Sequence, residues 1–240
     1  MVDPEQPCPD NHVRVVCISD THGLHGKIKR IPPGDILIHS GDFSSNGGIA
    51  HVQSFERWFS ALPHTHKIVI AGNHEITFQP EFYERNWQRF HHKRLDPVEI
   101  KNIITESQDI TYLEDSMTIA MGLCIYGSPW QPAFCNWAFN LKGGEAAVAK
   151  WDEIPEQVDV LVTHGPPFGI GDQCLDGSRA GCRHLLSRVQ VFRPKYHVFG
   201  HIHEGYGVFT DGATTFVNAS TCTAEYEPTN VPIVFDIKYK

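Results

Sequence analysis

Five short apolar runs, each ending in a polar cluster, constrain the fold of this chain more than any other feature. The runs are rich in Val and Ile, which is typical of strands buried on both faces of a parallel or mixed sheet. Each polar cluster begins where the apolar residues stop. The clusters are Asp20 and His22, Asp42, Asn73 and His74, His164, and His201 and His203.

Helix-length connections separate the first three runs, at 15–18, 35–39 and 67–71. One connection, 49–62, has apolar residues at helical spacing and is closed by Pro63. This order predicts a β-α-β-α-β unit, whose right-handed crossovers bring all strand carboxyl ends to one sheet edge. We therefore expect the polar clusters to meet there, where open α/β sheets bind ligands. If the backbone stays extended past Ser19, Asp20 and His22 project to the same side.

The rest of the chain continues the α/β pattern without an internal repeat or an interdomain linker. We expect one domain over 13–240 and a loosely held lead-in over 1–12. Residues 80–106 are polar and helix-prone, and 127–137 and 168–180 are loops. The other expected elements are helices at 143–151 and 182–191, strands within 117–126 and at 158–162, 195–199 and 231–237, and a hairpin of 206–210 and 214–217.

Composition narrows the class of partner. The formal net charge is −8 and the longest basic run is only 91–94, so we expect no polymeric nucleic acid partner. No apolar run is long enough to cross a membrane, and the acidic, Pro-containing start does not resemble a signal peptide. The seven cysteines are scattered without a Cys-x-x-Cys pair, which indicates reduced thiols and a cytoplasmic protein.

The polar clusters suit metal binding. Carboxylate, amide and imidazole without thiolate favour Mn²⁺, Fe or Zn²⁺. Seven such ligands are too many for one catalytic ion, but they fit two ions that share one carboxylate. A pair about 3.5–4 Å apart can activate a bridging water for in-line attack on phosphorus. Each cluster alone also has a plainer interpretation, because Asp and Asn favour turns for backbone reasons.

The motifs Asp-x-His, Gly-Asp, Gly-Asn-His-Glu, His-Gly-Pro and Gly-His-x-His, in this order, resemble the calcineurin-like metallophosphoesterase superfamily. The strings 127–132, 163–167 and 199–207 resemble its metallophosphoesterase-domain-containing (MPPED) branch. The resemblance spans about 13–237. It implies a four-layer α/β/β/α sandwich of two mixed sheets flanked by helices.

The resemblance also implies the role of each motif residue. Asp20, His22 and His203 bind the first divalent ion, Asn73, His164 and His201 bind the second, and Asp42 bridges them. His74 stabilises the transition-state charge or protonates the leaving oxygen, and with Asn73 and His201 it contacts the substrate phosphate. Mn²⁺ is the expected metal. Glu75 stands where the superfamily often has Asp, which would weaken or reposition its contact if it orients His74.

The leading hypothesis is a binuclear-metal-dependent phosphodiesterase acting on small phosphodiesters, with cyclic nucleotides as the expected substrates. All motif histidines are intact, which favours an active enzyme over a nucleotide-binding or scaffold protein on the same fold. A phosphomonoesterase or phosphoprotein phosphatase stays open as an alternative.

Residues outside the motifs give weaker signals. His39 is expected to be a hydrogen-bonded core histidine. Trp130, Phe134, Trp137 and Tyr206 could stack a nucleobase or simply pack. Asp172 and Arg179 are expected to be surface residues, or else to border the substrate. Histidines in polar stretches are expected to be solvated, namely His25, His51, His64, His66, His91 and His92.

Overall fold

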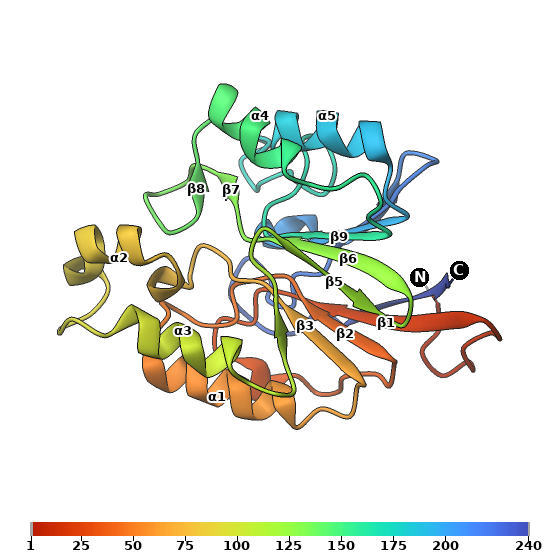
Figure 1. The fold of residues 1–240 in the computed structure, drawn as a ribbon, viewed down its shortest axis with the longest axis horizontal. Coiled ribbons are helices and arrows are strands. Elements are labelled where there is room, and N and C mark those ends of the chain that lie inside the picture. The colour runs from red at the N-terminus through yellow and green to blue at the C-terminus, as the bar shows by residue number, and fades with distance from the viewer. Residues whose placement is uncertain (1, 240) are drawn as a thin grey trace.

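Two β-sheets packed face to face form the centre of the protein, and helices cover both outer faces (Figure 1). The computed structural model describes residues 2–239. The first sheet has the order β13-β1-β2-β3-β4 and the second the order β11-β12-β10-β9-β6-β5. The architecture is therefore the four-layer α/β/β/α sandwich of two mixed sheets that was predicted.

The first sheet contains the three predicted parallel strands, but only one of the two predicted helical connections. α1 lies between β2 and β3, whereas the connection from β1 to β2 forms only the 3-10 turn η1, so the predicted β-α-β-α-β order was wrong at its first helix. β1 to β4 run parallel, and only β13 pairs antiparallel, with β1. α1 and α3 pack on its outer face through apolar residues such as Phe55 and Ile104. The elements are β1 (His12–Ile18), β2 (Ile36–His39), α1 (Ile49–Ser60), β3 (His66–Val69), α2 (Pro80–Asn86), α3 (Pro97–Thr105), β4 (Thr111–Tyr112) and β13 (Ile233–Lys238), with 3-10 turns η1 (His25–Lys27), η2 (Ile76–Phe78) and η3 (Trp87–Arg89).

The second sheet repeats this arrangement. β6, β9, β10 and β12 run parallel, while β5 and β11 pair antiparallel at its two edges. α4 and α5 cover its outer face through Trp151 and Leu185. The elements are β5 (Ser116–Ala120), β6 (Leu123–Ser128), a small pair of β7 (Gln131–Pro132) and β8 (Asn140–Leu141), α4 (Glu145–Asp152), β9 (Val160–Thr163), α5 (Arg183–Phe192), β10 (Tyr196–Phe199), η4 (His203–Gly205), β11 (Gly207–Thr210) and β12 (Thr215–Asn218).

Alternation along the strands explains why both faces of each sheet are apolar. In β1, Val15 and Cys17 pack in the core between the sheets, whereas Val16 and Ile18 pack against the helices. A period of two sends successive side chains to opposite faces, so a continuous apolar run fills two cores at once. A parallel bridge between Ser19 and Ser220 then joins the two sheets just beyond the end of β1.

Some residues differ from expectation. His25 and His64 are 5% and 2% exposed, so the prediction that they are solvated was wrong. His25 packs beside Trp58 and contacts the Ser54 hydroxyl, and the His64 Nε2 lies 2.9 Å from the Pro32 carbonyl oxygen. Asp172 is fully buried rather than at the surface. The prediction for His39 is confirmed, since it is buried and its Nε2 lies 2.9 Å from the Thr21 hydroxyl.

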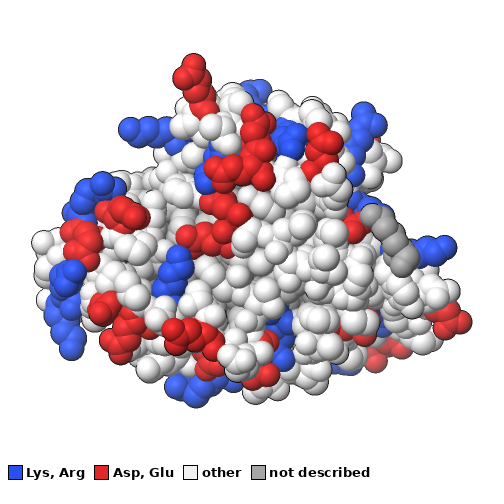
Figure 2. All heavy atoms as spheres, viewed as in Figure 1, with Lys and Arg blue, Asp and Glu red and all other residues white. Residues whose placement is uncertain are grey.

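Charge and membrane signals are modest. Figure 2 shows acidic and basic side chains on the same face, and this face carries no broad basic patch. Among the described residues, no helix combines the length and apolarity needed to cross a membrane. All seven cysteines are free.

A buried ion pair fastens the chain ends to the first sheet. Both oxygens of Asp236 on β13 accept from the Arg14 guanidinium on β1, at 2.8 and 2.9 Å, and the side chains are 6% and 7% exposed. Arg14 also donates to the carbonyls of Pro4 and Gln6. The hydrogen bond from the Arg14 guanidinium to Asp236 lowers the pKa of the Asp236 carboxyl below its ordinary 3.8.

Asp236→Asn is expected to lower the free energy of unfolding by about 3 kcal/mol, because it leaves the buried Arg14 charge uncompensated. Urea unfolding at neutral pH measures the loss. Since the pKa of Asp236 is lowered in the folded state, the wild type loses this stabilisation as the carboxyl takes up a proton. The difference in unfolding free energy between variant and wild type should therefore shrink as pH falls below about 4. Glu84→Gln breaks the exposed Arg94–Glu84 pair and should cost less than about 1 kcal/mol. Equal losses of unfolding free energy in the two variants would contradict the larger role of the buried ion pair.

Candidate metal centre

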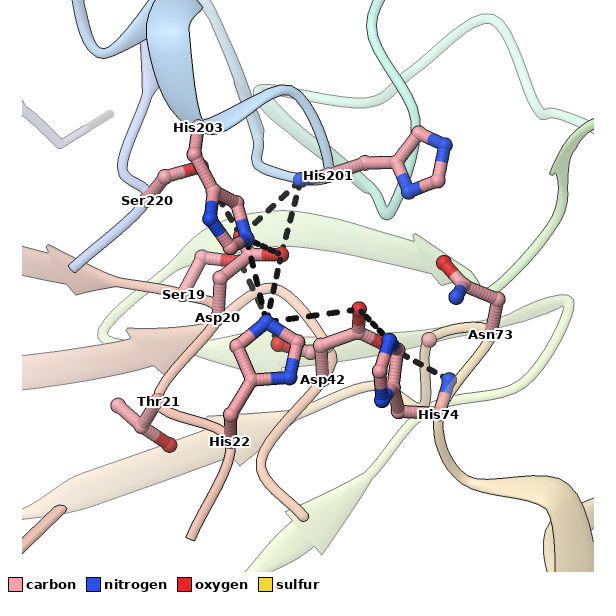
Figure 3. A network of polar contacts seen from close by, with 12 residues as sticks. Ser19, Asp20, Thr21, His22, Asp42, Asn73, His74, His201, His203 and Ser220 are labelled. Carbon is pink, nitrogen blue, oxygen red and sulfur yellow. Dashed lines mark hydrogen bonds and ion pairs between the residues drawn. The ribbon is translucent and has the colours of Figure 1, made fainter. Parts of the chain in front are cut away.

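The loops that follow β1, β2, β3, β9 and β10 meet at one edge of the two sheets and bring the predicted residues together (Figure 3). The rings of His22 and His203 turn toward Asp20 on one side of Asp42, and His201 and Asn73 lie on the other side. Asp20 and His164 are fully buried, while Asp42, Asn73 and His22 are no more than 6% exposed.

The first group is Asp20, His22 and His203. The Nε2 atoms of His22 and His203 lie 3.1 Å apart, and the His203 Nε2 is 3.5 Å from Asp20 Oδ1. Two imidazole nitrogens this close share one proton or face one cation. The donor set of one carboxylate and two imidazoles matches the ligand types of Mn²⁺, Fe and Zn²⁺.

The second group is Asp42, His164 and His201. The His164 Nε2 lies 3.3 Å from Asp42 Oδ2 and 3.0 Å from the Asn73 amide oxygen, which adds a fourth donor. Asp42 Oδ2 is also 4.0 Å from the His22 Nε2, so this carboxylate lies between both groups. The structure thus brings together all seven residues predicted as ligands.

The Nδ1 atoms of three site histidines are fixed by backbone carbonyls. His164, His203 and His74 contact the carbonyl oxygens of Ser40, Thr223 and Ser45 at 2.9, 2.9 and 2.8 Å, respectively. A carbonyl can only accept, so Nδ1 carries the proton and Nε2 faces the cluster. Metal-binding histidines are oriented in this way.

The electrostatics of the cluster favour a cation. Burial disfavours charge on His164 and His203, but the carboxylates of Asp42 and Asp20, respectively, overcome this and raise each pKa to about 9. Burial lowers the pKa of His22 to about 4 and of His201 to about 3. Two buried carboxylates therefore draw protons onto their nearest imidazoles. A divalent cation supplies the same compensation when it displaces those protons.

The backbone at the site corrects one expectation. β1 ends at Ile18, and Asp20 and His22 have φ of 51° and 45°, so the chain does not continue extended past Ser19. Asp42 and His201 are also left-handed, at 55° and 66°. A left-handed backbone conformation costs free energy in residues other than glycine, and residues that adopt it cluster at functional sites. The left-handed turns, rather than strand alternation, bring the Asp20 and His22 side chains to one place.

Hydrogen bonds between the loops hold these conformations. The amides of Asp20 and His22 donate to the carbonyls of Gly41 and Asp42, at 2.9 Å each. Asp20 accepts from the amide of His201 and the hydroxyl of Ser220, which tie the first sheet to the second. The protein itself thus positions the Asp20 carboxylate.

Glu75 has a different role from the one considered from sequence. It is fully buried and accepts from the amides of Asp42, Ser44 and Gly72 at 2.8–2.9 Å, and from the Ser44 hydroxyl at 2.8 Å. The side chain fastens the loops after β2 and β3 together. Orientation of the His74 ring comes instead from the Ser45 carbonyl.

Aromatic side chains border the cluster. The Trp137 ring lies 4.2 Å from the His74 ring, and Phe134, 58% exposed, lies 6.0 Å from the His201 ring. Tyr226, which sequence reasoning missed, lies 4.8 Å from His22 and 5.2 Å from His203. Trp130 donates to Asp115 and Tyr206 donates to the Val231 carbonyl. Within the part of the chain that the structure describes, neither ring contacts a side chain of the cluster.

Close packing at Gly200 gives a test of the preformed geometry. An alanine Cβ there would clash with Asp20 Oδ2 and with the side chain of Ser19. Gly200→Ala is therefore expected to displace the Asp20 carboxylate and weaken Mn²⁺ binding by about 10–100-fold, measured by calorimetric titration. Gly143→Ala is the matched control, since a Cβ there has nothing within 4 Å. Unchanged Mn²⁺ affinity in Gly200→Ala would show that the packing around Asp20 is not needed.

Comparison with known proteins gives three findings. A model of the calcineurin-like phosphoesterase family matches residues 13–205. The human and mouse proteins called metallophosphoesterase domain-containing protein 1 are each 48% identical over 99% of this chain and 76% of their own length. The phosphopantetheinyl hydrolase PptH of Mycobacterium tuberculosis has a similar fold, with a TM-score of 0.57 and 13% identity over 90% of this chain and 92% of that one.

Proposed function

Since the chain belongs to the calcineurin-like phosphoesterase family, which supports a phosphoester hydrolase, we propose that it is a binuclear-metal-dependent phosphodiesterase acting on small phosphodiesters. The observation that carries the proposal is the pair of ligand groups on either side of Asp42, with imidazole Nε2 atoms turned inward. Two groups around one shared carboxylate suit two ions better than one.

The proposed assignment follows the two groups. Asp20, His22 and His203 would hold one ion, Asn73, His164 and His201 the other, and Asp42 would contact both. When bound, the ions would supply an activated water and neutralise charge developing on the phosphate. Mn²⁺ is the proposed metal, because the set mixes oxygen and nitrogen donors.

His74 is the proposed proton donor of the chain itself. Its amide donates to Asp42 Oδ1 at 2.8 Å, and its Nδ1 proton is engaged by the Ser45 carbonyl. Its Nε2, 3.8 Å from Asp42 Oδ2, is left to hold a proton beside the reacting phosphate. There it would stabilise charge or protonate the leaving oxygen.

Cyclic nucleotides are the proposed substrates. Exposed Phe134 beside His201 and the Trp137 ring beside His74 offer aromatic faces next to the cluster, and such faces stack nucleobases. A cyclic phosphodiester would place its phosphate among Asn73, His74 and His201 while its base reaches this aromatic border.

The test is hydrolysis of bis-p-nitrophenyl phosphate by protein loaded with Mn²⁺, compared with p-nitrophenyl phosphate. We expect turnover that depends on Mn²⁺ and favours the diester. Preference for the monoester would indicate a phosphomonoesterase instead. No turnover of either compound by protein carrying two ions would indicate a binding or scaffold protein.

A further inference from the structure

Two adjoining cavities lead away from the metal centre. The first, of about 450 Å³, is lined by His201, Phe134 and Glu204 and opens at the proposed metal ligand His201. The second, of about 550 Å³, lies beside the start of α5. Pro132, Ala133, Arg179 and Gly181 line both, so one wall of the first cavity continues into the second.

The second cavity is basic in a chain whose net charge is −8. Its charged lining residues are Arg179 and Arg183, with His184 beside them, and its lining among the described residues contains no Asp or Glu. The first cavity is different, because Glu204 lines it together with Arg179. Outside the metal centre itself, the side chains that can attract an anion are therefore gathered at the second cavity.

Both arginines are positioned by neighbours. Arg179 donates to Asp172 at 2.7 Å, and the fully buried Asp172 also accepts from the amides of Gly169 and Gly181, at 2.8 and 3.2 Å. The guanidinium carbon of Arg183 lies 3.5 Å from the centre of the Phe168 ring. A guanidinium held in place loses less entropy on binding a phosphate.

Arg183 keeps its donors available. Among the described residues it forms its ring contact with Phe168 and no ion pair, and it is exposed at the cavity. Arg179 uses one nitrogen for Asp172, and its planar fork has others. Two guanidinium groups beside one cavity are suited to a phosphoryl group, which accepts several charge-assisted hydrogen bonds.

We propose that the cavity lined by Arg179 and Arg183 binds a second phosphoryl group of the substrate, remote from the ester that is cleaved. This inference rests on the proposed function, because it places the scissile phosphate at His201 and the alcohol portion in the first cavity. The substrate class is thus a small phosphodiester whose alcohol carries a further phosphate.

The test compares adenosine 2′,3′-cyclic phosphate with its 5′-phosphorylated form, using protein loaded with Mn²⁺. Wild type is expected to prefer the phosphorylated form in kcat/KM. Arg183→Gln and Arg179→Gln should each lower that preference by about tenfold or more, because each removes charged donors from the phosphate. Arg57→Gln, on an exposed position of α1, makes the same charge change elsewhere and should retain the preference.

Calorimetric binding of the same two ligands separates this inference from the proposed function. Weaker binding of the phosphorylated form by Arg183→Gln, with no turnover of either ligand, would support the cavity while contradicting the phosphodiesterase. An unchanged preference in both arginine variants, in turnover and in binding, would overturn the inference. Equal binding of the two ligands by wild type would also overturn it, because the added phosphate would then gain nothing from the cavity.

Discussion

Asp42→Asn is expected to remove both metal ions and to reduce diester hydrolysis below about 1% of wild type. Asp42 Oδ2 lies 3.3 Å from the His164 Nε2 and 4.0 Å from the His22 Nε2, so one carboxylate belongs to both ligand groups. An amide has no net charge to offer two divalent cations, which weakens both sites at once. Metal content by elemental analysis and turnover of bis-p-nitrophenyl phosphate should fall together.

A matched control separates this loss from a general effect of the substitution. Asp211→Asn makes the same chemical change at an exposed turn, where the side chain accepts from the amides of Ala213 and Thr214. It should keep both ions and full activity. If Asp42→Asn retained two ions per chain, the shared-carboxylate arrangement would be wrong.

His74→Ala is expected to keep both ions and to lower kcat by roughly 10²–10⁴. The ring is 14% exposed and its Nε2 faces the cluster, so its removal takes away a proton donor or charge stabiliser beside the phosphate. The measurement is steady-state turnover together with metal content. His92→Ala, at an exposed position, is the control and should match wild type in both.

Loss of metal from His74→Ala would show that His74 is a metal ligand and not only a proton donor or charge stabiliser. His74, His22 and Asp42 form a third group whose atoms lie close enough to hold an ion. The Nε2 distance of 3.8 Å to Asp42 Oδ2 is compatible with either role, so metal content is the deciding measurement.

The sequence was sufficient to predict the longer strands and where the polar clusters meet. It missed the two-residue strands β4, β7 and β8, and β7 lies in the segment 127–137 that was expected to be a loop. Continuous apolar runs such as 15–18 and 68–71 fill two cores, and strand polarity then brings their ends to one edge. The resemblance supplied the pairing of the two sheets. The sequence also predicted that the seven polar residues after the longer strands would lie together, as they do in the structure.

Conformation inside the loops was not predictable from these patterns. Left-handed φ at Asp20, His22, Asp42 and His201 depends on hydrogen bonds between loops distant in sequence, such as the Asp20 amide to the Gly41 carbonyl. Glu75 accepts hydrogen bonds from the backbone amides of Asp42, Ser44 and Gly72. Nearly every residue type has such an amide, so the sequence does not indicate these partners. Tyr226 lies in an irregular polar stretch between β12 and β13, so no periodicity indicated its place beside His22.

Burial of isolated polar residues was the other source of error. Asp172 is buried because it accepts from two loop amides and from Arg179, and a Gly-rich stretch of sequence gives no sign of that closure. His25 and His64 are buried beneath neighbouring elements for similar reasons. Hydrogen-bonded burial of a single polar side chain is a tertiary property.

The most direct test of the central claim is an anomalous difference map at the manganese edge from crystals soaked in Mn²⁺. We predict two peaks, one among Asp20, His22 and His203 and one among Asn73, His164 and His201, with Asp42 in contact with both. A single peak, or peaks away from Asp42, would contradict the two-metal centre.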